Sequence, residues 1–201
     1  MRTITEQPKT NPVLADVAIE AAKRQLLTLP WVDQAFGRVW PIPMQRGDKN
    51  VTEPCVYCNG NRYETLVPSA DLGNYTFFVL MDSARYDEET DTYTQPYALV
   101  VWYDMKRCFE NGSNRRDTEN LKDDIIEVLR STPISNGSIH VSRIIEMPKS
   151  VYKEFTFDTQ QNQALETDCA VGLYEGLVLL CVEGELFVDR FRHFDDAADV
   201  D

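Results

Sequence analysis

Histidine and glycine are scarce in this chain: two histidines and nine glycines among 201 residues. The histidines, His140 and His193, are far apart, and neither stands in a Ser-His-Asp or Cys-His pattern. The glycines fall mostly in predicted turns and form neither a P-loop nor a G-x-G-x-x-G loop for phosphate. We therefore predict that the protein is not an enzyme and needs no cofactor.

Positive charge and long apolar runs are also lacking. The chain has 33 acidic and 20 basic residues, a net charge of −13, and no run rich in Lys or Arg. Nucleic acids bind mainly through cations that neutralise phosphates, so we expect no sequence-specific nucleic-acid binding and no attraction to anionic membranes. The longest apolar runs, 77–81, 98–103 and 177–182, are too short to cross a bilayer, and the N-terminus shows no secretion signal. We expect synthesis in the cytoplasm.

The apolar content is that of a globular protein. Hydrophobic residues make up 43% of the chain and aromatic residues 10%, and a chain of this length forms one ordinary domain. We predict a single domain, 1–201, with its core over about 12–190. The first ten residues are polar and are expected to be loose, as is the acidic C-terminal tail.

Two amphipathic helices are predicted, over about 12–29 and 118–130. Asn11 and Pro12 suit the first helix's N-cap and first position, and Pro30 ends it. Leu121 and Ile125 begin the apolar stripe of the second helix, which stops before Pro133.

Most of the remaining chain predicts strands. Residues 31–40 favour β structure, the prolines at 41 and 43 predict an extended stretch, and 46–50 and 183–184 predict turns. Asn59-Gly60 is typical of a hairpin turn, and 82–95 reads as a solvated acidic loop. The strands are predicted at 53–57, 62–67, 76–81, 95–105, 138–146 and 170–182. Because helices and strands are segregated along the chain, we predict an α+β fold with a mostly antiparallel sheet.

Cys55 and Cys58 form a C-x-x-C pair, which can be a redox dithiol or half of a zinc site. The flanking residues are β-like rather than the start of a helix, and no further ligands follow at local spacing. We interpret the pair as two small hydrophobic residues, with metal binding or redox chemistry as the alternative. A pairing of His140 with a cysteine stays open.

Aromatic residues cluster after the first predicted helix. Trp31, Phe36 and Trp40 lie in a segment interrupted by prolines, which is difficult to bury fully. Tryptophan and tyrosine are enriched at the anchors of protein interfaces, so we predict that these three residues contact a partner. Trp102, in the most apolar strand, is expected to lie in the core.

The order of elements resembles the small ring-forming proteins of tailed-phage necks and tails, in particular tail terminator and tail-completion proteins. It is also similar to uncharacterised proteins of prophage-like gene clusters. The resemblance spans about 12–182 and rests on three features: the helix ending in Leu29-Pro30-Trp31, a β-meander, and a helix near 118–129 between strands. It implies no catalytic residues. It implies a homo-oligomeric ring that contacts other tail or neck proteins, and a place in the virion. A monomeric adaptor that adds a strand to a partner's sheet is a further alternative.

Overall fold

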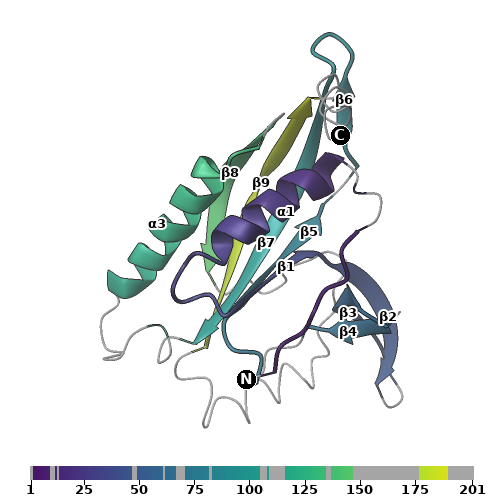
Figure 1. The fold of residues 1–201 in the computed structure, drawn as a ribbon, viewed down its shortest axis with the longest axis vertical. Helices are drawn as coiled ribbons and strands as arrows, with labels where there is room; N and C mark the ends of the chain where they lie inside the picture. The colour runs from purple at the N-terminus through teal and green to yellow at the C-terminus, as the bar shows by residue number, and fades with distance from the viewer. Residues whose placement is uncertain are drawn as a thin grey trace, which may run out of the picture.

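The computed structural model describes residues 2–9, 12, 14–46, 49–60, 62–66, 71–81, 83–104, 108, 116–134, 137–146 and 177–189. Within them, two helices cover one face of a large sheet, and a small sheet lies against part of its other face (Figure 1). The predicted α+β class is confirmed, and so is the mostly antiparallel pairing, since among the described strands only β1 and β5 run parallel.

The helices are α1 (Leu14–Leu26) and α3 (Arg116–Ser131). The strands are β1 (Gln34–Arg38), β2 (Trp40–Arg46), β3 (Lys49–Cys58), β4 (Arg62–Thr65), β5 (Tyr75–Leu80), β6 (Arg85–Asp87), β7 (Thr92–Asp104), β8 (Gly137–Glu146) and β9 (Leu177–Asp189). The large sheet has the order β1-β5-β7-β9-β8, with β6 beside one end of β7, and the small sheet has the order β2-β3-β4.

Strand β7 is buried on both faces, as its apolar sequence predicts. Alternate residues point to opposite sides of a strand. Leu99 and Val101 therefore pack under the helices, while Val100 and Trp102 pack toward the small sheet. The expected core position of Trp102 is confirmed.

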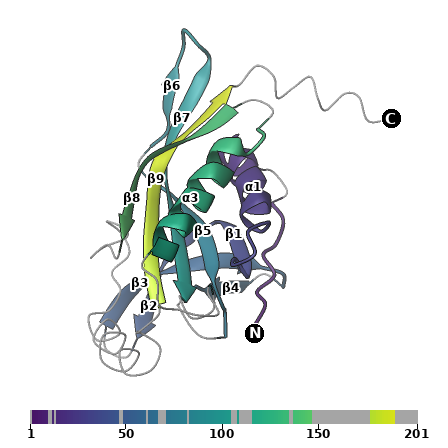
Figure 2. The ribbon, with the colours of Figure 1, turned by 90° about the vertical axis from the view of Figure 1, so that its left-hand side faces the viewer.

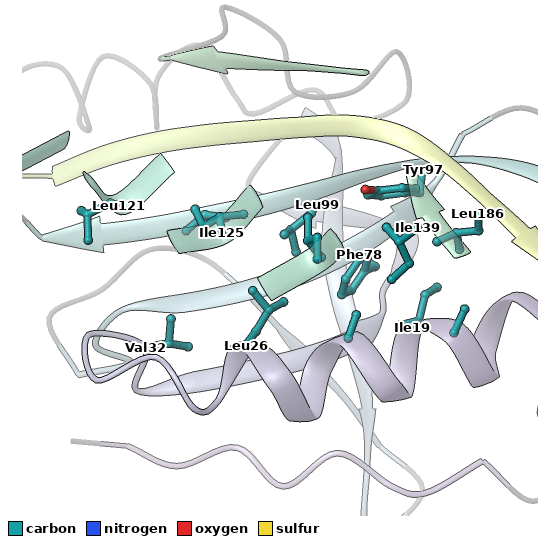
Figure 3. Close-up of a cluster of buried hydrophobic side chains, with 14 of the residues drawn as sticks. Ile19, Leu26, Val32, Phe78, Tyr97, Leu99, Leu121, Ile125, Ile139 and Leu186 are labelled. Carbon is teal, nitrogen blue, oxygen red and sulfur yellow. The ribbon is translucent and has the colours of Figure 1, made fainter. Parts of the chain in front are cut away.

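The two helices lie side by side on one face of the large sheet (Figure 2). Their apolar stripes meet that face in a cluster that includes Ile19, Leu26, Ile125 and Leu99 (Figure 3). Helix α1 ends at Leu26, three residues before the predicted end, and the hydroxyl of Thr28 bonds to the carbonyl of Gln25. Because a proline at position 30 disfavours helical backbone at the residue before it, the chain leaves the helix early.

Strand β9 corrects the predicted turn at 183–184, because it continues through Gly184 to Asp189. Gly184 pairs with Tyr97 on one side and with Val141, beside an irregularity in β8, on the other. A Cβ atom at Gly184 would lie 1.8 Å from the carbonyl oxygen of His140. The glycine thus allows close backbone approach inside a sheet instead of marking a turn. Of the predicted strand 170–182, residues 170–176 lie outside the described residues.

The N-terminal strap, residues 2–9, corrects the expectation of a loose decapeptide. Ile4 is buried, and its N–H donates to Oε1 of Gln34 at 2.9 Å. The carboxylate of Glu6 accepts the N–H of Gly37 at 2.9 Å, so the strap covers the outer edge of β1. A polar sequence is held here by hydrogen bonds, which hydrophobic periodicity does not reveal. The predicted acidic tail lies outside the described residues, as does the N-cap at Asn11.

Candidate protein-interaction surface

Two of the three predicted interface aromatics are core residues, which corrects that prediction. Trp31 is 8% exposed, its indole N–H donates to Oδ2 of Asp124 on α3 at 3.1 Å, and its ring meets Tyr103 edge-on. Phe36 is 2% exposed and packs on Tyr75. Trp31 is buried under the helices and Phe36 on the opposite face of the large sheet, because β1 pairs with β5 in that sheet, a pairing that the local sequence did not predict.

Trp40 is the predicted interface residue that stays on the surface, with 40% of its area exposed. It begins β2, after the chain has left the large sheet. The guanidinium carbon of Arg38 lies 4.1 Å from the centre of the Trp40 ring, a cation–π contact. The tryptophan is thereby held in place while much of its ring remains available to a partner.

The small sheet has two different faces. Val56 and Cys58 point toward the large sheet and belong to its core. The opposite face carries side chains whose ladder positions alternate with those two. We call it the Trp40 face; its large apolar members are Trp40, Ile42, Met44, Tyr57 and Tyr63.

The Trp40 face is apolar and partly open to solvent. Tyr63 is 50% exposed and its ring centre lies 5.1 Å from that of Tyr57, while Ile42 and Met44 are half-buried. Large exposed apolar side chains gathered on one face are typical of interaction sites, whereas single ones are ordinary. Sequence reasoning missed Tyr57 and Tyr63. Their alternation on either side of Asn59-Gly60 was the signal that could have found them.

The edge of β2 is closed to strand addition. Pro41 and Pro43 alternate along β2, opposite Pro54 and Thr52 of β3. Proline has no N–H, so in an edge strand it removes the donors that another strand would need. A partner that approaches the β2 side of the small sheet is therefore expected to contact side chains of the Trp40 face.

Cys55 and Cys58 lie on opposite faces of β3. They are three residues apart in a strand, and side chains alternate, so the two thiols point away from each other. The thiol of Cys55 lies 3.7 Å from the hydroxyl of Thr65, and Cys58 sits in the core, where burial raises its pKa and disfavours the thiolate. Hence this geometry favours neither a shared metal nor a dithiol.

The other polar candidates are placed separately. His140 is exposed on β8 of the large sheet, where its ring meets that of Phe187. Cys55 and Cys58 instead lie on β3 of the small sheet. His193 lies outside the described residues. Within the described ranges, no group of three or more His, Cys, Asp or Glu side chains could hold a metal ion.

The acidic segment predicted as a loop includes a β-hairpin. Strands β6 and the start of β7 pair through Arg85–Thr94, Tyr86–Tyr93 and Asp87–Thr92. A carboxylate oxygen of Asp87 accepts the N–H of Glu89 at 2.9 Å, and chiefly this bond lowers the pKa of Asp87. The turn therefore holds a fixed, ionised carboxylate with Glu88 and Glu89 exposed beside it.

No protein-family model matches the sequence, and no curated protein is similar to it. In the described residues, no helix is both long enough and apolar enough to cross a membrane. The resemblance to phage tail proteins therefore remains an expectation that depends on the order of elements.

Proposed function

We propose that this protein is a structural assembly subunit that associates with further copies of itself through the Trp40 face. The observation that carries the proposal is an apolar, aromatic face on a sheet whose other side is already packed. A three-stranded sheet needs one buried face for stability, so a second apolar face that includes Trp40 and Tyr63 is in excess of what folding requires.

The edges of the two sheets support contact through a face over contact through strand addition. The N-terminal strap covers β1, and two prolines interrupt the donors of β2. Strand β8 carries an irregularity between Val141 and Arg143, a feature that disrupts regular pairing at sheet edges. These features count against the alternative of an adaptor that adds a strand to its partner.

The form of assembly we propose is a closed ring at a phage neck or tail, as the resemblance implies. Contacts between two different surfaces close into rings when the rotation between subunits permits it. A net charge of −13 would repel DNA phosphates from the lumen of such a ring and ease passage. Native mass spectrometry tests this form: a single closed mass supports it, and an open-ended ladder of masses contradicts it.

Sedimentation over a concentration series tests self-association itself. We expect wild-type protein to assemble and Trp40→Ala to dissociate at least tenfold more readily, because truncating an interface hot spot costs about 2 kcal/mol or more. The Trp40→Ala variant should stay folded, which circular dichroism checks, since 40% of this residue is exposed in the single chain.

Leu27→Ala is the matched control. Leu27 is 47% exposed and follows α1, away from the small sheet, so its truncation should leave assembly unchanged. A wild-type protein that remains monomeric across the whole concentration series would overturn the proposal. If Trp40→Ala and Leu27→Ala lose assembly equally, assembly depends on general surface hydrophobicity and not on the Trp40 face.

A further inference from the structure

The β6–β7 hairpin projects from one end of the molecule (Figure 1). Four carboxylates lie within five residues at its tip: Asp87, Glu88, Glu89 and Asp91. Tyr86, 42% exposed, donates a hydrogen bond to Asp91, and its ring centre lies 4.8 Å from that of Tyr93, with the two rings tilted by 35°. The hairpin thus projects from the molecule and exposes an aromatic ring next to a group of negative charges.

The Trp40 face lies toward the other end, as the two views at right angles agree (Figures 1 and 2). A positive charge lies beside the exposed tryptophan of this face, because the guanidinium of Arg38 lies over the Trp40 ring. Among the described residues, Glu53 is the acidic residue on this face, and it is 4% exposed, so its carboxylate is not presented to a docked partner.

We propose that the acidic hairpin of one subunit docks on the Trp40 face of the next, with its carboxylates toward Arg38. This inference rests on the proposed self-association and names the second surface. The two surfaces differ and lie at opposite ends of one chain, so the proposed contact is heterologous and head-to-tail, and each subunit both gives a hairpin and receives one. Native mass spectrometry distinguishes this ring from a symmetric dimer that pairs the same two surfaces twice.

The overall charge explains why such local pairing is needed. Copies with a net charge of −13 repel one another, and that repulsion extends over many ångströms. At physiological salt the screening length is about 8 Å, which weakens the long-range repulsion more than a pair in direct contact. Association should therefore be strongest at intermediate salt and weaker at both extremes.

Charge reversal in two separate variants gives the decisive test. Glu88→Lys/Glu89→Lys reverses the hairpin and keeps the turn-forming Asp87, while Arg38→Glu reverses the receiving face. Alone, each variant pairs like charge with like, so we expect at least a tenfold weaker self-association. Mixed in equal amounts, the two provide complementary contacts in alternation, and we expect assembly to return.

Asp123→Lys/Glu127→Lys is the control for the hairpin variant. Each of the two replaces two acidic residues by lysines, so the net charge changes equally, but the control makes this change on the exposed side of α3. It should assemble as wild type does. Circular dichroism of each variant checks folding, and return of assembly in the mixture shows by itself that both variants are folded.

The outcomes separate this inference from the proposed function. Wild-type protein that never assembles overturns both. Wild-type assembly that is lost in Trp40→Ala but retained in both charge variants overturns the hairpin inference alone. A mixture that stays dissociated while each variant is folded also overturns it.

Discussion

The two faces of the large sheet are closed by different means. The first cover is the helix layer, which packs on one face of the sheet through a continuous apolar stripe that includes Ile19, Leu26 and Ile125. The second cover, on the other face, consists of the small sheet and the strap, and it combines a few apolar residues such as Ile4 and Val56 with buried polar residues. The first cover is made by hydrophobic burial, and the second depends also on directional hydrogen bonds.

The outward sides of the two covers differ as well. Helix α3 turns charged residues such as Asp123 and Glu127 outward, which is the ordinary surface of an amphipathic helix. The small sheet turns Trp40 and Tyr63 outward. The helix layer thus ends at a solvated surface, whereas the small sheet presents a second apolar face, and for this reason we assign function to the small sheet.

Phe78→Ala and Phe77→Ala compare the two covers directly. These adjacent residues of β5 are both fully buried, Phe78 under the helices and Phe77 under the small sheet. Truncating a buried phenylalanine costs about 3–5 kcal/mol, and the cost falls when the surroundings can collapse into the cavity. We expect about 4 kcal/mol for Phe78→Ala and about 3 for Phe77→Ala, because the strap can shift more easily than two packed helices.

Urea denaturation measures both losses, with the slope checked for unchanged two-state behaviour. Hydrogen exchange adds location: Phe77→Ala should raise exchange in the strap and β3, and Phe78→Ala in α1 and α3. Equal free-energy losses with identical exchange patterns would show that the two covers respond as one unit.

Gln34→Ala tests the polar part of the second cover. Oε1 of Gln34 accepts the N–H of Ile4 at 2.9 Å, and Nε2 donates to the carbonyls of Arg2 and Leu72 at 3.0 and 2.7 Å. Leaving buried backbone groups without partners costs about 1–3 kcal/mol. We expect that loss of stability, together with faster tryptic cleavage after Lys9 as the strap loosens.

Gln25→Ala, on α1, serves as the matched control and should change neither stability by more than about 0.5 kcal/mol nor the cleavage rate. If Gln34→Ala destabilises the protein while the strap is cleaved at the wild-type rate, the amide stabilises the segment at Leu72 rather than the strap.

The sequence predicts the helix-covered face well and the other face poorly. Strand β7 and both helices show strong periodicity, because burial against a regular partner repeats at fixed spacing. The strap has no such pattern, and one apolar residue, Ile4, is buried from it. Its position is set by contacts to Gln34 and Gly37, more than 25 residues away, so no local rule could place it.

The candidate surface was predicted in part. Trp40 was identified from its proline-rich context, yet the same context misled the prediction for Trp31, which a partner on α3 buries. Whether an aromatic lies in the core depends on which strands pair, and pairing at long range is not encoded in a short window. For Cys55 and Cys58 the spacing does decide: once β3 is a strand, their opposite orientation follows from alternation alone.

Lys23→Met probes the weakest difference between the covers, the ion pairs at the strap. The Lys23 ammonium lies 3.0 Å from Oε2 of Glu6 and 2.7 Å from Oε2 of Glu20. Burial favours the neutral amine, but the bonds to Glu20 and Glu6 outweigh it and hold the pKa of Lys23 above 10.5. A raised pKa in the folded state stabilises the protein at pH values below the unfolded pKa, and this contribution is lost as pH rises through the folded pKa.

We therefore expect the stability difference between wild type and Lys23→Met to be less than about 1 kcal/mol at pH 7 and to diminish as the pH rises above about 10.5. Both proteins lose stability over that range, because burial raises the pKa of Tyr75 and Tyr97, whose phenols ionise earlier when unfolded. Taking the difference between the two proteins removes that common loss.

Lys122→Met, which breaks the Lys122–Glu119 pair on α3, provides the comparison. Glu119 is 69% exposed, so this pair should contribute less than the one at the strap. An equal pH dependence in both variants would show that the strap gains nothing from its partly buried ion pairs.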